Sequence, residues 1–208
     1  MQKAFAFLLL VSCFCSAFCQ EPEKRKAEAS IDGNSVISMY PFQFIFSSFK
    51  LGFEQKISEK LSLKGMASLG LNEHSLIYDV ENYSAFSIEG QLRYFPMKKS
   101  LSGIYGAVYF YDRGASFEEF IIFPGPFPIP ATTTYNLNSI GGGVLFGVQL
   151  FARKIVSFDF YAGGGPNIPI KKAPTNNPNN TFGSDLIFNN YRKAIGFHSG
   201  FSIGLVLK

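Results

Sequence analysis

The 208 residues of this chain correspond to roughly one domain, and its net charge of +4 is too diffuse along the sequence to indicate a nucleic-acid partner. Charged residues make up 16% and aromatic residues another 16%, with 24 Phe, 10 Tyr and no Trp, whereas a typical soluble domain is about 25% charged. This composition excludes disorder and a coiled coil, and no apolar run reaches the about 20 residues that a membrane-spanning helix needs.

The N-terminal residues have the pattern of a secretory signal peptide. A positive start is followed by a continuous apolar stretch over residues 4–18, which is too short to span a bilayer. Two small residues, Ala17 and Cys19, fit a cleavage site. The sequence therefore predicts a signal peptide over residues 1–19, followed by a periplasmic segment over residues 20–33.

All three cysteines lie in this predicted signal peptide, at positions 13, 15 and 19. The mature chain is therefore expected to hold no thiol and no disulfide, which suits an exported protein that folds without oxidation. A second interpretation stays open, because Leu10–Cys13 has the Leu-x-small-Cys form of a lipidation site. The apolar run continues past Cys13, which favours ordinary cleavage.

The rest of the chain alternates between apolar and polar residues with a period of two, which is the period of a β-strand. In the last such segment Phe201, Ile203 and Leu205 share one face, while His198 and Ser202 share the other. The same alternation predicts eight strands near residues 35–45, 48–56, 61–71, 83–95, 103–113, 133–151, 156–165 and 194–208.

The connections between these strands alternate between short and long. The long ones are residues 72–82, 114–132 and 166–193. This alternation predicts an all-β fold, an eight-stranded antiparallel up-and-down transmembrane β-barrel over residues 34–208. An even number of strands puts both termini on the side of the short turns, the periplasmic side. Pro41 lies within the first predicted strand, which would have to end in a tight turn at residues 46–48.

The face that points outward decides between a soluble barrel and a membrane barrel. A soluble, calycin-like barrel buries its apolar face, whereas a membrane barrel turns that face to lipid and keeps a polar lumen. The polar face here is rich in Gly and Ser, as a narrow lumen requires, and aromatic residues at 94–95 and 109–111 suggest interfacial girdles. Charges of both signs on the polar face are expected to pair inside, namely Lys50, Glu54, Lys64, Glu89, Arg93 and Asp159. These features favour the membrane barrel.

An opening motif and the last predicted strand carry a family resemblance. The motif reads NSVI at Asn34–Ile37 and then LGFEQK at Leu51–Lys56, before a short turn. In these features the chain resembles the small eight-stranded outer-membrane barrel proteins of Gram-negative bacteria. Within that group, the resemblance is strongest to secreted barrels whose function is unknown. The last strand also resembles their assembly signal, although it ends in Lys208 instead of an aromatic residue. The resemblance implies an outer-membrane location and no particular activity.

Enzymes of this architecture exist, and their histidines are the first residues to consider. The eight-stranded lipid A deacylases resemble this barrel and use a His-x-Ser pair on one strand face, whereas here Ser199 directly follows His198. Adjacent strand residues point to opposite faces, and Ser202 lies roughly 13 Å along the strand, so neither serine can pair with His198 as nucleophile and base. His74 is expected in a solvated loop. We predict no catalytic residue, with His198 hydrogen-bonded inside the lumen.

Metal and phosphate chemistry find no support in the sequence. The mature chain has no Cys and its two histidines are far apart, so no metal and no cofactor are expected. The glycine triplets at 141–143 and 163–165 are not followed by Lys-Ser/Thr or a helix, and tight packing in a narrow barrel explains them better. The acidic pair Glu118–Glu119 is expected to be solvated.

The unusual segment is the predicted loop over 114–132, which is aromatic and aliphatic where an exposed loop should be polar. Four prolines, at positions 124, 126, 128 and 130, stiffen it. It either folds over the barrel mouth, or extends the apolar wall, or offers a pre-ordered apolar surface to a partner, a lipid or a hydrophobic ligand. The residues expected to make such contacts are Phe117, Phe120, Ile121, Ile122, Phe123 and Phe127.

These observations predict a small outer-membrane barrel with a structural or surface-interaction role through its extracellular loops. An eight-stranded barrel is filled by its own side chains, so a general pore is disfavoured. The expected partners are outer-membrane lipid and an extracellular or periplasmic protein, and the barrel is expected to be a monomer. Two alternatives stay open, namely a lipid-modifying enzyme like the lipid A deacylases and a barrel that binds small apolar ligands.

Overall fold

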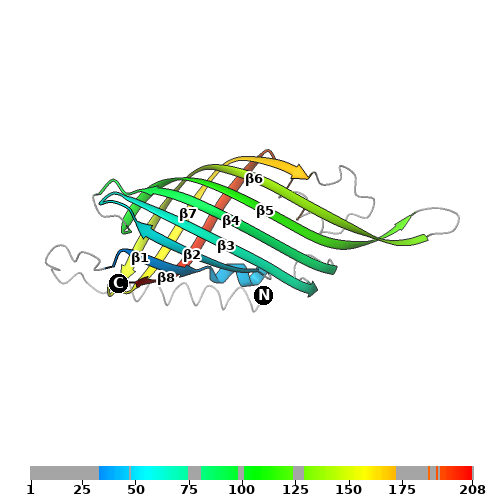
Figure 1. The fold of residues 1–208 in the computed structure, drawn as a ribbon, viewed down its shortest axis with the longest axis horizontal. Coiled ribbons are helices and arrows are strands. Elements are labelled where there is room, and N and C mark those ends of the chain that lie inside the picture. The colour runs from blue at the N-terminus through cyan, green and yellow to red at the C-terminus, as the bar shows by residue number, and fades with distance from the viewer. Residues whose placement is uncertain are drawn as a thin grey trace, which may run out of the picture. The chain divides into compact units, whose positions relative to one another are not determined.

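The computed structural model describes residues 33–46, 48–74, 81–97, 101–123, 129–171, 187, 191 and 193–207. Within these residues eight strands pair in sequence order, each antiparallel to the next, and the first pairs with the last, so the sheet closes into a barrel (Figure 1). The strands are β1 Ser35–Met39, β2 Ser48–Lys56, β3 Leu61–His74, β4 Glu81–Tyr94, β5 Gly103–Phe123, β6 Ile129–Ala152, β7 Val156–Lys171 and β8 Ile195–Leu207. The predicted closed, antiparallel, all-β barrel is confirmed. The predicted signal peptide lies outside the described residues.

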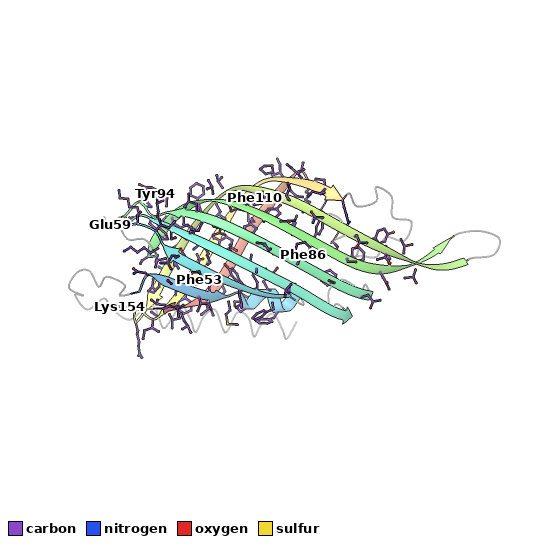
Figure 2. All side chains as sticks on the ribbon, viewed as in Figure 1. Phe53, Glu59, Phe86, Tyr94, Phe110 and Lys154 are labelled. Carbon is purple, nitrogen blue, oxygen red and sulfur yellow. The ribbon has the colours of Figure 1, made fainter. Side chains whose placement is uncertain are left out.

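The two faces of the sheet differ because successive side chains of a strand point to opposite sides. On β3, Leu63 is 51% exposed and Leu69 is 61% exposed, while Lys64 is only 1% exposed. Figure 2 shows Phe53, Phe86 and Phe110 along the wall of the barrel. The predicted division is therefore confirmed, with the apolar face outside and the polar face in the lumen.

The hairpin of β5 and β6 is much longer than the sequence predicts. The predicted loop over 114–132 is wrong, because β5 runs to Phe123, β6 begins at Ile129, and these two residues are register partners. In Figure 1 the green pair of strands extends beyond the ends of its neighbours. Aromatic and β-branched residues favour a strand here. Proline is tolerated in the part of β6 that precedes Asn138, because among the described residues this part pairs only with β5 and not with β7.

Two other predicted loops are also shorter in the structure. β3 continues to His74 and β4 begins at Glu81, so both strands extend into the predicted loop over 72–82. His74 is therefore not a loop residue but the last residue of β3, where it is the register partner of Glu81. Strand β7 likewise continues to Lys171.

The first strand is shorter than predicted because of Pro41. β1 ends at Met39, and Pro41–Phe46 forms a 3-10 helix, η1, before β2 begins. Proline has no N–H to donate to a neighbouring strand, and the ladder between β1 and β8 stops at the pair Met39↔Ile203. The prediction of a continuous strand over 35–45 is wrong beyond Met39.

The two ends of the barrel are built differently. The start of β1 and the end of β8 are register partners, Ser35↔Leu207, at the end that carries the short turns. Towards the other end a hydrophobic cluster forms, in which Phe117 and Leu137 pack with Ile187 from the connection between β7 and β8. Among the described residues, no helix is long and apolar enough to cross a membrane.

Candidate functional site

Paired charges fill the lumen and give it the most distinctive chemistry of the barrel. Arg93 of β4 lies at the centre and is fully buried. Its two terminal nitrogens contact Glu54 Oε2 of β2 at 3.2 Å and Asp159 Oδ2 of β7 at 2.9 Å. Asp159 also contacts Lys64 Nζ of β3 at 2.8 Å. The prediction that charges on the polar face pair inside the barrel is confirmed.

A second group of charges lies beside the first. Lys50 Nζ contacts Glu89 Oε2 at 2.9 Å, and the other oxygen of Glu89 contacts His198 Nε2 at 2.9 Å. Gln91 joins the two groups, because its amide nitrogen donates to Glu89 at 2.7 Å and its oxygen accepts from Arg93 at 2.6 and 2.9 Å. The polar network is therefore continuous from His198 to the Arg93 group.

Burial makes this pairing necessary. A buried ion costs several kcal/mol in desolvation unless a counter-ion and hydrogen bonds compensate it. The network balances three anions with three cations, namely Glu54, Glu89, Asp159, Lys50, Lys64 and Arg93. Neutral donors occupy further acceptor positions, since Ser62 and Gln149 donate to Glu54 and Tyr105 donates to Asp159. Such an arrangement fits a packed lumen better than a water-filled channel.

His198 lies in a stack of tyrosines at the edge of the network. Its ring centroid is 4.8 Å from that of Tyr109 and 5.5 Å from that of Tyr161. The predicted lumenal, hydrogen-bonded histidine is confirmed. Ser199 is exposed on the opposite face, so the two residues do not form a base and nucleophile pair. In the part of the chain that the structure describes, no group of three His, Cys, Asp or Glu could hold a metal ion.

One prediction about this region is wrong. The sequence places Tyr109–Tyr111 in an interfacial girdle, but Tyr109 and Tyr111 are buried in the lumen and only Phe110 between them faces outward. The period of two requires this split, because three consecutive strand residues cannot share one face.

Tyrosine rings pack over glycines on the neighbouring strands, a feature that the sequence did not reveal. Tyr105 lies over Gly147, and Tyr161 lies over Gly200, so that a Cβ on either glycine would collide with the ring. Small residues on the lumenal face are the signal for such packing, and the predicted tight packing of strand glycines is consistent with it. The partner of each ring could not be predicted, since it depends on the strand register.

Five of the six residues predicted to contact a partner lie in β5. Phe117 is fully buried and its ring centroid is 5.5 Å from that of Tyr135, so it supports the hairpin from within. Residues 120–123 form the end of β5, where their backbone pairs with residues 129–132. Phe127 lies outside the described residues, and the contact role of the six stays a prediction. Glu119, expected to be solvated, is buried.

The fold and lumen define the class of the molecule, which is a closed eight-stranded antiparallel barrel with an ionic interior and an apolar outer wall. No family model matches the chain, and no curated protein matches it. Among solved structures it is similar to the N-terminal β-barrel domain of Pseudomonas aeruginosa OprF, with a TM-score of 0.40 and 10% identity, over 84% of this chain and 98% of that one. A likeness at this level carries no functional argument.

Proposed function

We propose that this chain is a small outer-membrane β-barrel protein, neither an enzyme nor a general pore, with a structural or surface-interaction role through its β5–β6 hairpin. The observation that carries the proposal is that the barrel is apolar outside and charged inside. Phe146 is 71% exposed and Phe197 is 80% exposed, while Arg93 is 0% exposed. Water opposes such an arrangement, whereas the hydrocarbon of a bilayer favours it.

The height of the apolar wall supports a membrane location. On β6 the outward positions are apolar or Gly from Leu150 to Ile140, and the next outward residue is Asn138. This run of about ten residues extends about 34 Å along a strand, which covers about 26 Å across a bilayer at a tilt of about 40°. That height matches the apolar band of about 25 Å in outer-membrane barrels. The resemblance of the opening motif to Gram-negative barrels supports the choice of the outer membrane.

The contents of the lumen support a role other than general diffusion. Gln91, Gln149 and Tyr105 are fully buried around Arg93 and are hydrogen-bonded across the interior. Small barrels filled by their own side chains leave no aqueous channel. Reconstituted in a planar bilayer, the protein should show no steady conductance of the size that a general porin gives.

The β5–β6 hairpin supports a surface-interaction role. It continues beyond the apolar wall, and the buried cluster around Phe117 and Leu137 orders its base. A surface that is ordered before binding loses less entropy when a partner binds. The sequence from Phe120 to Pro130 is apolar and rich in proline, which suits contact with a protein or a lipid.

The location is tested by membrane fractionation, followed by electrophoresis of boiled and unboiled samples. An intact membrane barrel should stay in the outer-membrane fraction and should migrate differently before and after boiling. A soluble periplasmic species that migrates identically in both lanes would overturn the proposed location.

The surface-interaction role is tested by shortening the hairpin. Replacing residues 120–132 by Asn-Gly joins the register partners Glu119 and Thr133 through the two-residue turn that hairpins favour. The matched control replaces residues 75–80 by Asn-Gly between another pair of register partners. With folding confirmed by the boiling shift, chemical cross-linking on intact cells should lose adducts only in the first variant. Equal adducts in both variants would contradict the role.

A further inference from the structure

A cavity of about 720 Å³ lies at the point where the first strand stops. Its volume is in the range of about 300–1,000 Å³ that small-molecule sites occupy. It is bordered by outward residues of β6, β7, β8 and η1, among them Phe42, Phe160 and Phe201, and also by lumenal residues such as Tyr161. The charged residues of the lumenal network do not border it, so it is a separate feature of the barrel.

The wall of the barrel is incomplete beside this cavity. The ladder between β1 and β8 ends at Met39↔Ile203, so residues 195–202 of β8 pair with no strand on that side among the described residues. The next pair of the ladder would require an N–H from residue 41, which is proline. In hydrocarbon an open strand edge is tolerated only where its N–H and C=O groups find partners.

The direction of the free backbone groups follows from the neighbouring strand. Val206 donates its N–H to Ile155, on the β7 side of β8. Alternate residues of a strand direct their N–H and C=O groups to opposite neighbours. The backbone groups of Phe201 and Ser199 therefore point to the open side, where the cavity lies.

The outer half of the cavity is apolar. The ring centroid of Phe201 is 5.5 Å from that of Phe42 on η1 and 4.6 Å from that of Phe160 on β7, so the three rings form a row along the wall. Beside this row lie the register partners Ala162 and Ser199, which are both exposed. Their side chains are small and therefore leave the space of the cavity, the hollow, unfilled. A hydrocarbon chain fits such a surface.

The inner end offers hydrogen-bonding groups. Tyr161 is 6% exposed, and its ring crosses Gly200, its register partner on β8, which carries the hydroxyl towards the open edge. Across the part of the chain that the structure describes, this hydroxyl has no hydrogen-bond partner. Buried tyrosine hydroxyls usually have one. The free hydroxyl and the free backbone groups of β8 therefore lie at the same place.

We propose that this opening binds a long-chain fatty acid, with its carboxyl group at Tyr161 and the edge of β8 and its hydrocarbon chain along the three phenylalanines. A molecule with one polar end satisfies both ends of the cavity. A bilayer phospholipid, by contrast, keeps its head group at the membrane surface and would bring only hydrocarbon to the free backbone groups. The inference rests on the proposed membrane location of the wall, and it is independent of the role of the hairpin.

Photo-crosslinking tests the proposal with the full chain reconstituted in phosphatidylcholine vesicles. One arm uses hexadecanoic acid that carries a diazirine, and the other uses phosphatidylcholine with the same diazirine-bearing chain. The fatty acid should label peptides that contain Phe42, Phe160 or Phe201 about tenfold more than the wall peptide with Phe86, as expected for about 1.4 kcal/mol of preference. The phosphatidylcholine probe should label all of these peptides alike.

Substitutions locate the site within the wall. Ala162→Trp fills the hollow and should lower labelling by the fatty acid about tenfold, and Ser199→Trp is a second filling variant in case the first does not fold. Ala67→Trp is the matched control, because Ala67 is also exposed, on β3, and does not border the cavity. Tyr161→Phe removes only a hydroxyl, and it should weaken competition by unlabelled fatty acid about fivefold while leaving competition by the corresponding alkane unchanged.

Three outcomes would overturn the proposal. Uniform labelling by the fatty acid would mean that the opening is not a binding site. Equal enrichment of the phosphatidylcholine probe would assign the opening to a bilayer lipid. Enrichment that appears only after residues 20–32 are deleted would assign it to that segment of the chain. The boiling shift of every sample distinguishes a folded barrel that does not bind from a failure of the proposed membrane location.

Discussion

Replacement of Arg93 by Met removes the central cation of the lumen and leaves two buried carboxylates without it. The guanidinium contacts Glu54 at 3.2 Å and Asp159 at 2.9 Å. Asp159 keeps Lys64 at 2.8 Å as a second cation, whereas the remaining hydrogen bonds to Glu54 come from neutral donors, Ser62 and Gln149. The charge left on Glu54 is therefore the main source of the expected destabilisation.

The expected cost is about 3–5 kcal/mol, the range for breaking a buried ion pair by removing one partner. Glu54→Gln should cost a similar amount, because it leaves Arg93 with one carboxylate fewer. In the double variant Arg93→Met/Glu54→Gln, the loss should be smaller than the sum of the single losses by about 1–3 kcal/mol, since the two residues interact directly. Arg153→Met, in an exposed turn, is the control and should change stability by less than about 0.5 kcal/mol.

The assay is urea unfolding of the protein in phosphatidylcholine vesicles, followed by the electrophoretic shift of unboiled samples. Electrophoresis is preferred because the chain has no Trp to report unfolding by its fluorescence. A loss below about 1 kcal/mol for Arg93→Met, or single losses that simply add, would refute the reasoning. Either result would mean that water screens the lumenal charges, as in a medium of high dielectric constant.

The same titration checks the outer wall and the packing of the lumen. Phe110→Arg, on the exposed wall of β5, should destabilise the inserted barrel by about 2–4 kcal/mol, whereas Ser116→Arg, beyond the wall, should cost less than about 1 kcal/mol. Equal costs at the two positions would contradict the membrane location. Gly147→Ala places a methyl group against the ring of Tyr105 and the backbone oxygen of Phe160 and should cost about 1–3 kcal/mol, while Gly65→Ala, which has open space around the added carbon, should cost less than about 1 kcal/mol. A tolerated Gly147→Ala would show that both the ring and the backbone of β7 can shift.

The face on which each charge lies could be predicted from the sequence, but its partner could not. Lys64 and Arg93 belong to the lumenal face because strand parity is a local property. That both meet Asp159 depends on how β3 and β4 lie opposite β7 once the barrel closes. Strand tilt and stagger set this arrangement, and neither can be read from the period of the sequence.

The ends of the strands were harder to predict for a similar reason. The sequence between Phe117 and Pro130 contains acidic and proline residues, which favour a loop when each segment is considered alone. In the structure β5 and β6 stabilise each other along their length, and Phe117 also packs against Ile187 from a distant part of the chain. The effect of Pro41 is equally remote, since the open edge that it leaves belongs to β8.

Most aromatic residues divide between wall and lumen according to whether they carry a hydroxyl group, with the fully buried Phe95 and Phe117 as exceptions. Phenylalanines are exposed along the wall at Phe49, Phe53, Phe86, Phe110, Phe146, Phe160 and Phe197, whereas tyrosines are buried at Tyr40, Tyr83, Tyr105, Tyr109, Tyr111, Tyr161 and Tyr191. A phenol hydroxyl turned to hydrocarbon would lack a partner and cost about 1–3 kcal/mol, while in the lumen Tyr105 donates to Asp159 at 2.7 Å and Tyr111 donates to Asn167 at 2.9 Å. Tyr94 is exposed at the end with the short turns, where in the proposed membrane location its polar tip would reach the interface. The hydroxyls of Tyr109 and Tyr161 have no hydrogen-bond partner among the described residues. Of the two, only Tyr161 borders the cavity at the open edge of β8, where the carboxyl group of the proposed fatty acid would supply that partner.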